Sequence, residues 1–164
     1  MPYRPYDQAC SIASTLALIG ERWTLLILRD VLLGARRFED LQRSTGAATN
    51  ILSDRLDTLV DHGVLRRVPL PERPDRFEYR PTRAGAELAH VLQALMQWGD
   101  RHAARPEGPP RVLVHTACGH TTEPVHVCAH CGDPLEPGEV EVHPGPGATP
   151  EIVAAGVLPA RPRA

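Results

Sequence analysis

The fold of this chain is decided by residues 23–67, WTLLILRDVLLGARRFEDLQRSTGAATNILSDRLDTLVDHGVLRR. Within this stretch, residues 49–62 are predicted to form one amphipathic helix. Apolar side chains recur at helical spacing along one side of it: Leu52, Leu56, Leu59 and Val60. The remaining surface is polar: Asn50, Ser53, Asp54 and Asp57, with Arg55 near its edge. Gly63 follows at the position where a residue without Cβ is favoured, so the helix ends there.

The segments around this helix predict a small helical domain with one hairpin. Further helices are expected at residues 11–19, 21–33, 38–44 and 83–102. A tight connector, Gly46-Ala47-Ala48, precedes the helix at 49–62, and Thr49 or Asn50 can cap that helix through a side-chain oxygen. Residues 64–68 and 76–80 are β-prone and flank the loop PLPERPD, which predicts a hairpin with an arginine-bearing tip. This order predicts a winged helix-turn-helix, mainly α with a small β-hairpin (α+β).

Charge divides the chain into two modules. Residues 1–106 contain 15 Arg against 13 Asp and Glu, a net charge of +2, whereas residues 107–164 contain 3 Arg against 7, a net charge of −4. We therefore expect a winged helix-turn-helix domain for DNA binding and dimerisation over residues 7–105, and a small separate module over residues 111–143. The last residues, 144–164, are rich in Pro, Gly and Ala and are expected to be poorly ordered.

Composition also excludes several classes of protein. The chain has no run of roughly 18 apolar residues and its first residues lack a signal-peptide pattern, so we expect a cytoplasmic protein without a membrane partner. Four Cys in a reducing compartment indicate metal binding or redox sensing rather than structural disulfides. No paired carboxylates, phosphate-binding loop or nucleophile–base arrangement is present, so an enzyme is not expected.

Four motifs resemble the HxlR-type bacterial transcriptional regulators, which are related to the MarR group. They are GERWTLLILRDVLLG, RRFEDL, LSDRL and FEYRPTRAG, and the resemblance covers roughly residues 7–100. It implies a homodimer joined through its first and last helices and bound to a two-fold symmetric operator in double-stranded DNA, with repression the expected action. It also implies an effector, either a small molecule or an electrophile. Cys10 stands where some members sense electrophiles, which makes it a candidate redox sensor; the alternative is a small packed residue.

The predicted helix-turn-helix supplies two kinds of DNA contact. Base readout is expected from short polar side chains at the start of the recognition helix: Thr49, Asn50 and Ser53. Phosphate contacts are expected from arginines before the preceding helix and at the wing tip: Arg36, Arg37, Arg73 and Arg76. Arg55 either contacts DNA or pairs with Asp54, Asp57 or another helix. The alternative function is a protein-interaction module that uses the winged helix and the second module as docking surfaces.

The second module carries two pairs of metal-ligand residues, His115 with Cys118 and Cys128 with Cys131, with nine residues between the pairs. A glycine follows each pair, and short β-prone pieces are expected at 112–114, 125–127 and 140–142. The pattern resembles a zinc ribbon in which one Cys is replaced by His, and it predicts a structural zinc ion. The fourth ligand is left open by the missing Cys: spacing favours His115, and three other histidines are the alternatives, His120, His126 and His130. The alternatives are an unmetallated hairpin packed on the dimer or a disordered tail with a redox-active CxxC.

Overall fold

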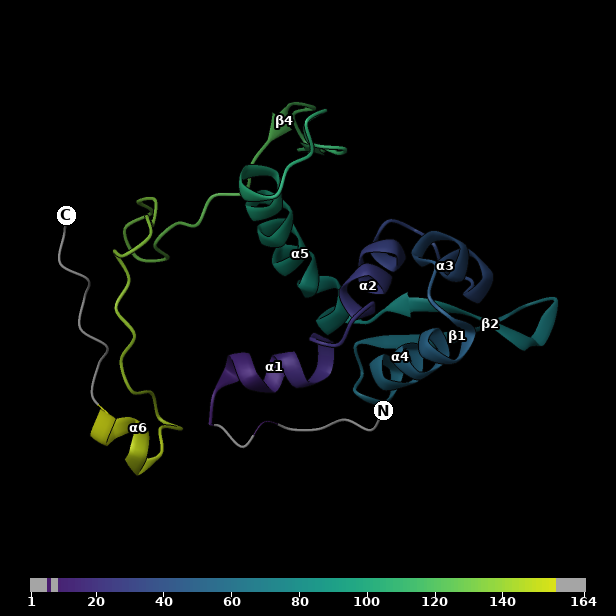
Figure 1. Ribbon diagram of the computed structural model, residues 1–164, viewed down its shortest axis with the longest axis horizontal. Coiled ribbons are helices and arrows are strands. Elements are labelled where there is room, and N and C mark those ends of the chain that lie inside the picture. Colours follow the sequence, from purple (N-terminus) through teal and green to yellow (C-terminus); the bar gives the residue numbers. More distant parts are fainter. Residues whose placement is uncertain (1–5, 7–8, 156–164) are drawn as a thin grey trace. The chain divides into compact units, whose positions relative to one another are not determined.

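The computed structural model describes residue 6 and residues 9–155, and its chain divides into two compact units after Gly99 (Figure 1). The first unit contains these elements in order: α1 (Ser11–Ile19), α2 (Thr24–Leu32), α3 (Phe38–Thr45), α4 (Thr49–Asp61), β1 (Leu65–Leu70), β2 (Arg73–Pro81) and most of α5 (Arg83–His102). The second unit contains β3 (Leu113–Val114), β4 (Thr121–Thr122) and α6 (Pro150–Ala155). The predicted winged helix-turn-helix, helical with one small hairpin, is confirmed.

The core of the first unit is formed by the apolar faces of α2, α3, α4 and the two strands. Its most deeply buried side chains are Ile27, Leu28, Val31, Leu41, Leu52, Leu56, Leu59 and Leu65. The predicted stripe of α4 therefore faces inward, with Leu52 and Leu56 fully buried. Burial of each such side chain stabilises the fold by about 1.5–3 kcal/mol.

The second helix begins later than predicted, because residues 21–23 form a turn. Trp23 has a φ of 80°, in the left-handed region, and the amide of Thr24 donates to the carbonyl of Glu21 at 3.1 Å. The Arg22 guanidinium lies 4.9 Å from the centre of the Trp23 ring, which packs against the core. No single helix of the described residues is long and apolar enough to cross a membrane; α1 and α2 pass that test only as a pair bent by 79°, by length and composition.

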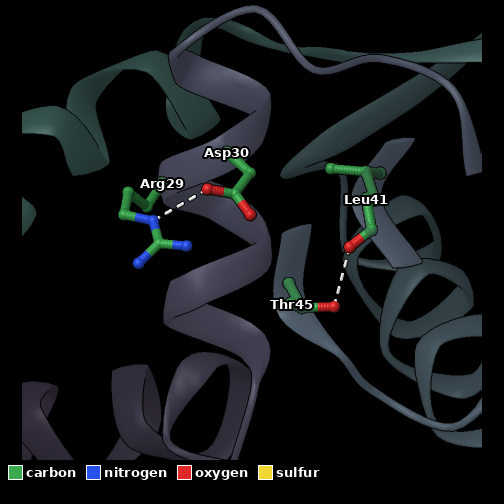
Figure 2. Close-up of polar contacts among 4 residues, drawn as sticks. All are labelled: Arg29, Asp30, Leu41 and Thr45. Carbon is green, nitrogen blue, oxygen red and sulfur yellow. Dashed lines mark hydrogen bonds and ion pairs between the residues drawn. The ribbon is translucent and has the colours of Figure 1, made fainter. Parts of the chain in front are cut away.

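A polar cluster lies where α2 faces α3 (Figure 2). The carboxylate of Asp30 is buried and accepts a hydrogen bond from Arg29 Nε at 2.8 Å. The Thr45 hydroxyl donates to the carbonyl of Leu41 at 2.7 Å and accepts from the amide of Ala47 at 3.3 Å. The two bonds of the Thr45 hydroxyl satisfy polar groups at the end of α3 and hold the turn that follows.

The turn between α3 and α4 needs a glycine, because Gly46 has a φ of 70° and its amide donates to the carbonyl of Gln42 at 2.8 Å. The prediction that Thr49 or Asn50 caps α4 is wrong. The capping position is Ala48, which makes no side-chain bond to the helix. Thr49 is already inside the first turn, and its hydroxyl oxygen instead accepts a hydrogen bond from Gln42 Nε2 at 2.8 Å. This bond ties α3 to α4 directly.

The wing is an antiparallel hairpin that pairs Leu65 with Pro81 and Pro69 with Phe77, with an irregularity between Pro69 and Leu70. Its strands are longer than predicted and leave only residues 71–72 as the turn. Proline is tolerated because each strand of a two-stranded hairpin has a free edge. The amide of Tyr79 donates to the carbonyl of Arg36 at 2.8 Å, which fastens the wing to the loop before α3.

The start of α5 is packed closely against the start of β1. The Thr82 hydroxyl donates to the carbonyl oxygens of Gly63 at 2.6 Å and Val64 at 3.1 Å, and it accepts from the amide of Gly85 at 3.2 Å. A Cβ at Gly85 would lie 2.1 Å from the carbonyl oxygen of Val64, so only glycine fits. Beyond this point Leu88 and Leu92 of α5 pack against the core while partly exposed, and Gly85 is the only buried residue of the helix.

The second unit contains little regular structure. β3 pairs with β4, and a single bridge joins Val127 to Pro134. The strand predicted at residues 140–142 is absent from the described structure, and that prediction is wrong because no partner strand lies beside those valines. In the segment predicted to be poorly ordered, the structure has the short helix α6, and residues 156–164 lie outside the described residues.

Candidate nucleic-acid interface

The first turn and a half of α4 presents the three predicted base-reading side chains to solvent. Thr49, Asn50 and Ser53 are all exposed, on the side opposite the buried leucines. Spacings of three and four residues place Ser53 beside the other two on one face of the helix. The Thr49 oxygen is occupied by Gln42, which leaves its hydroxyl proton for donation to a base or phosphate.

A groove of about 720 Å³ lies between α3, α4 and the wing. Ser53 of α4 and the aromatic rings of Phe38, Phe77 and Tyr79 contribute to its wall. Its charged lining combines four arginines with four acids: Arg37, Arg43, Arg67 and Arg76 with Glu39, Asp40, Asp57 and Asp75. The groove thus has the position of a nucleic-acid interface in a winged helix, but its charges are balanced.

Ion pairing separates these arginines into two kinds. Arg43 Nη1 lies 3.3 Å from Asp40 Oδ1, and Arg67 pairs with Asp57 while stacking 5.2 Å from the centre of the Phe77 ring. Neither Arg37 nor Arg76 has an ion pair within the described part of the chain. Unpaired, exposed guanidinium groups are the ones best able to neutralise phosphates.

The other two predicted phosphate contacts, Arg36 and Arg73, are not in the lining of this groove. Arg36 is half-buried, directly before the exposed Arg37, which occupies the capping position of α3. Arg73 is exposed at the start of β2, beside the turn of the wing. The predicted arginines are therefore at least partly exposed to solvent, with one exception.

The exception is Arg55, which points into the protein and is 7% exposed. Its Nη2 lies 3.6 Å from Glu21 Oε2 and 3.5 Å from Asp54 Oδ2, while its Nε is buried without a hydrogen-bond partner among the described residues. Of the two roles that the sequence left open, the structure supports pairing, with Asp54 and with the turn before α2. The guanidinium ties the recognition helix to that turn.

Three residues of this region were not predicted. Gln42 orients Thr49, and Arg43 and Arg67 line the groove. Arg43 could have been found from its position three residues after Asp40, a spacing that places both on one helix face. For Gln42 and Arg67 the sequence carries no local signal, because their partners are seven and ten residues away.

The predicted metal ligands form two separate pairs in the second unit. His115 Nδ1 lies 3.2 Å from Cys118 Sγ. Hydrogen bonds from the backbone of Cys131 and His130 lower the pKa of the Cys128 thiol. No group of three or more His, Cys, Asp or Glu side chains that could hold a metal ion occurs in the described residues. The zinc site therefore stays a prediction, as does sensing by Cys10, which is exposed directly before α1.

Comparison with known proteins agrees with the winged fold. Residues 18–107 match the model of the HxlR-like helix-turn-helix family. The HTH-type transcriptional regulator Rv3095 of Mycobacterium tuberculosis is 45% identical over 145 residues, which cover 88% of this chain and 92% of the relative. An alignment of that length extends beyond residue 107, so it includes part of the second unit.

Solved structures of transcription factors share the same arrangement. The crystal structure of the transcription factor PA1607 is 38% identical, with a TM-score of 0.74 over 83% of this chain and 95% of that one. The quinone-bound structure of YodB from Bacillus subtilis is 25% identical, with a TM-score of 0.50 over 57% of this chain and 99% of that one. The likeness to YodB thus covers little more than half of this chain.

Proposed function

The chain belongs to the HxlR-like helix-turn-helix family, and we propose that it acts as a homodimer that represses transcription by binding a two-fold symmetric operator. As a member of this family it is a DNA-binding transcriptional regulator and not an enzyme. The proposal adds the dimer, the symmetric operator and the direction of regulation. The observation that carries it is the apolar surface left by α5.

Apolar side chains of α1 and α5 remain at the surface of the single chain. They are Ile12, Leu16, Val91, Leu95 and Trp98, between 41% and 71% exposed. Gly85 is the only buried residue of this 20-residue helix, and Leu88 and Leu92 pack against the core from it, so the exposed apolar side chains farther along gain little from their own domain. A second copy of the chain supplies a self-complementary cover for such a face, because a two-fold axis brings the same surface of both protomers together.

The dimer would place two copies of α4 on one side of the DNA. In dimeric helix-turn-helix proteins, the recognition helices enter successive major grooves about 34–36 Å apart. Asn50 is suited to bidentate bonding with adenine, and Thr49 and Ser53 can bond to either base edges or phosphates. Arg73 and Arg76 of the wing then face the backbone or the adjacent minor groove, where cations are attracted. Repression follows when the operator overlaps a promoter.

The test is to sequence the DNA fragments that the full-length protein selects from its own genome and to footprint the best of them. We expect a two-fold symmetric site whose half-sites lie about one helical turn apart, and transcription that falls when the protein is added. Selection of no fragment at low salt would overturn the proposal and favour a protein-docking role for the winged helix. A single, asymmetric footprint would overturn the proposal that the protein binds DNA as a symmetric dimer.

The dimer surface can be tested separately with a charge. Leu95→Glu places a carboxylate on the exposed face of α5, and we expect the variant to be a monomer that no longer binds the symmetric duplex. Val125→Glu is the matched control, because Val125 is 74% exposed in the second unit and outside both helices. A wild-type protein that is monomeric by light scattering would contradict the proposal, as would a Leu95→Glu variant that remains dimeric.

The proposal includes release of DNA on reaction with an electrophile at Cys10. This thiol is exposed and directly precedes α1, so a group added there would lie beside the proposed dimer contact. The quinone-bound state of YodB offers a precedent for the class of effector. We expect a quinone to weaken operator binding by the wild type and to leave Cys10→Ser unaffected. Equal weakening of both would exclude Cys10 as the sensor.

A further inference from the structure

Two turns of the second unit have the same backbone hydrogen bonds, and we call them the first knuckle (residues 115–120) and the second knuckle (residues 128–133). The amide of His115 donates to the carbonyl of His120 at 2.9 Å, and that of Cys128 donates to the carbonyl of Asp133 at 2.8 Å. In each, the glycine amide returns to the carbonyl of the first residue, Gly119 at 2.7 Å and Gly132 at 2.8 Å. The second unit thus contains an internal repeat of one turn.

Both glycines adopt a backbone conformation that this repeat requires. Gly119 has a φ of 72° and Gly132 a φ of 81°, which residues with a Cβ rarely adopt. The first knuckle closes the β3–β4 pair, and the second knuckle closes the bridge between Val127 and Pro134. Each knuckle is therefore a hairpin turn held at both ends.

Side chains at the first and fourth positions of the first knuckle approach one another. His115 Nδ1 lies 3.2 Å from Cys118 Sγ. Zinc–nitrogen and zinc–sulfur bonds of about 2.0 and 2.3 Å in a tetrahedron separate the two ligand atoms by about 3.5 Å, so this pair is near the spacing that one ion needs. The second knuckle carries Cys128 and Cys131 at the same two positions, in a turn with the same backbone hydrogen bonds.

The second unit lacks the burial that would hold such turns together. None of its described residues, from 100 to 154, is buried, and its valines are exposed: Val112, Val114, Val125, Val127, Val140 and Val142. Segments of this size without a core generally fold around disulfides or metal ions. The described cysteines of this chain are free thiols. A metal ion is the remaining source of stability that its side chains can supply.

We propose that the two knuckles close on one structural Zn²⁺, bound by His115 Nδ1 and by the sulfur atoms of Cys118, Cys128 and Cys131. The repeat favours His115 as the fourth ligand, and His126 lies outside both knuckles. His115 occupies the position of Cys128, whereas His120 occupies that of Asp133, and its Nδ1 lies 2.9 Å from the carbonyl oxygen of Cys118. His130 falls at the third position of its knuckle, which is Ala117 in the other.

Binding brings together two pairs that the structure describes separately. The segment between the knuckles, residues 121–127, would bend so that both pairs face one ion. Each cysteine binds as a thiolate, so up to three thiol protons pass to solvent, and the imidazole binds in its neutral form. The four protein ligands fill a tetrahedron and leave no open position, which makes the site structural. This inference concerns the second unit alone and does not depend on the proposed operator or dimer.

The experiment measures zinc in the full-length protein, purified without a metal-affinity step and in the presence of a thiol reductant. We expect about one zinc ion per chain in the wild type and almost none in Cys118→Ser or Cys131→Ser. His115→Ala should lose most of its zinc, and His115→Cys should keep it by providing a fourth thiolate. His120→Ala and His130→Ala are the matched controls and should keep about one.

Two further measurements make the outcome decisive. Cobalt substitution should give the intense visible bands of a tetrahedral site, together with a sulfur-to-metal charge-transfer band that grows in His115→Cys. Circular dichroism of the helices in every variant shows whether the first unit has folded, so zinc loss is not mistaken for a misfolded chain. A zinc-free wild type would overturn the site, as would zinc retained in both cysteine variants. Zinc lost in His120→Ala but kept in His115→Ala would overturn the assigned ligand.

Discussion

The two units of this chain are stabilised in different ways. In the first unit, leucines and isoleucines from four helices and a strand share one core, and several are completely buried. In the second unit, no described residue is buried, and regular structure is limited to the short pair β3–β4, the short helix α6 and two turns with matching hydrogen bonds. The comparison indicates that the winged helix folds through burial, whereas the extension has no such core and, on our proposal, folds around four metal-binding side chains. Changes that act on one source of stability should leave the other unit unaffected.

Removal of zinc should have the largest effect, and only on the second unit. If the metal provides its folding free energy, which is about 10–16 kcal/mol for structural zinc in small modules, a strong chelator will unfold it entirely. Hydrogen exchange should then become fast for amides of both knuckles, including those of Gly119 and Gly132, and stay slow in α2 and α4. Slow exchange that persists in the knuckles after chelation would contradict this expectation.

A cavity in the core should have the next largest effect, and on the first unit. Leu56 is completely buried in α4, so Leu56→Ala removes packed methyl groups and should cost about 2–5 kcal/mol of unfolding free energy. Val142→Ala is the control, because a side chain that is 73% exposed should change stability by less than about 0.5 kcal/mol. Urea unfolding followed by circular dichroism measures both. Similar losses in the two variants would indicate that the second unit also depends on burial.

The same distinction explains which sequence predictions were correct. Helix α4 was predicted to within one residue because its leucines have a regular spacing, and periodic burial is visible in a single sequence. The strand at 140–142 failed because alternating valines form a strand only beside a partner, which no local pattern reveals. The two knuckles were partly visible in the sequence, because the spacing and the glycines suggested them and spacing already favoured His115. Their matching backbone hydrogen bonds were not visible there.

Errors within the first unit have local causes of another kind. The start of α2 was misplaced because Trp23 adopts a left-handed backbone conformation, which is disfavoured for a tryptophan. The spacing of apolar residues gives no sign of this conformation. The cap of α4 was misassigned because Gln42, seven residues away, occupies the Thr49 oxygen. Arg55 lies at the boundary between the two faces of α4, so its direction is decided by the acids near it, Glu21 and Asp54.

Helix α5 connects the two units, and two of its glycines should respond in opposite directions. Gly85→Ala forces a Cβ against the Val64 carbonyl and should destabilise the first unit by about 1–3 kcal/mol. Gly99 has open space around its Cβ position, so Gly99→Ala should stabilise the helix by up to about 1 kcal/mol. Thermal unfolding of both variants measures the difference. A neutral Gly85→Ala would show that α5 is not packed closely against β1.

The smallest expected effect is a change in the salt dependence of DNA binding, which shows how much each unit contributes to that binding. Arg76 has no ion pair among the described residues and lies in the groove beside α4, so Arg76→Ala should weaken all duplexes and reduce the slope of log affinity against log salt by about 0.9. Asn50→Ala should instead weaken only the specific site, with the slope unchanged. Residues 107–164 carry a net charge of −4, so Cys131→Ser should also leave the slope unchanged. A slope that falls in Cys131→Ser would mean that the second unit contacts phosphates, and that the division between a DNA-binding unit and a metal-binding unit is incomplete.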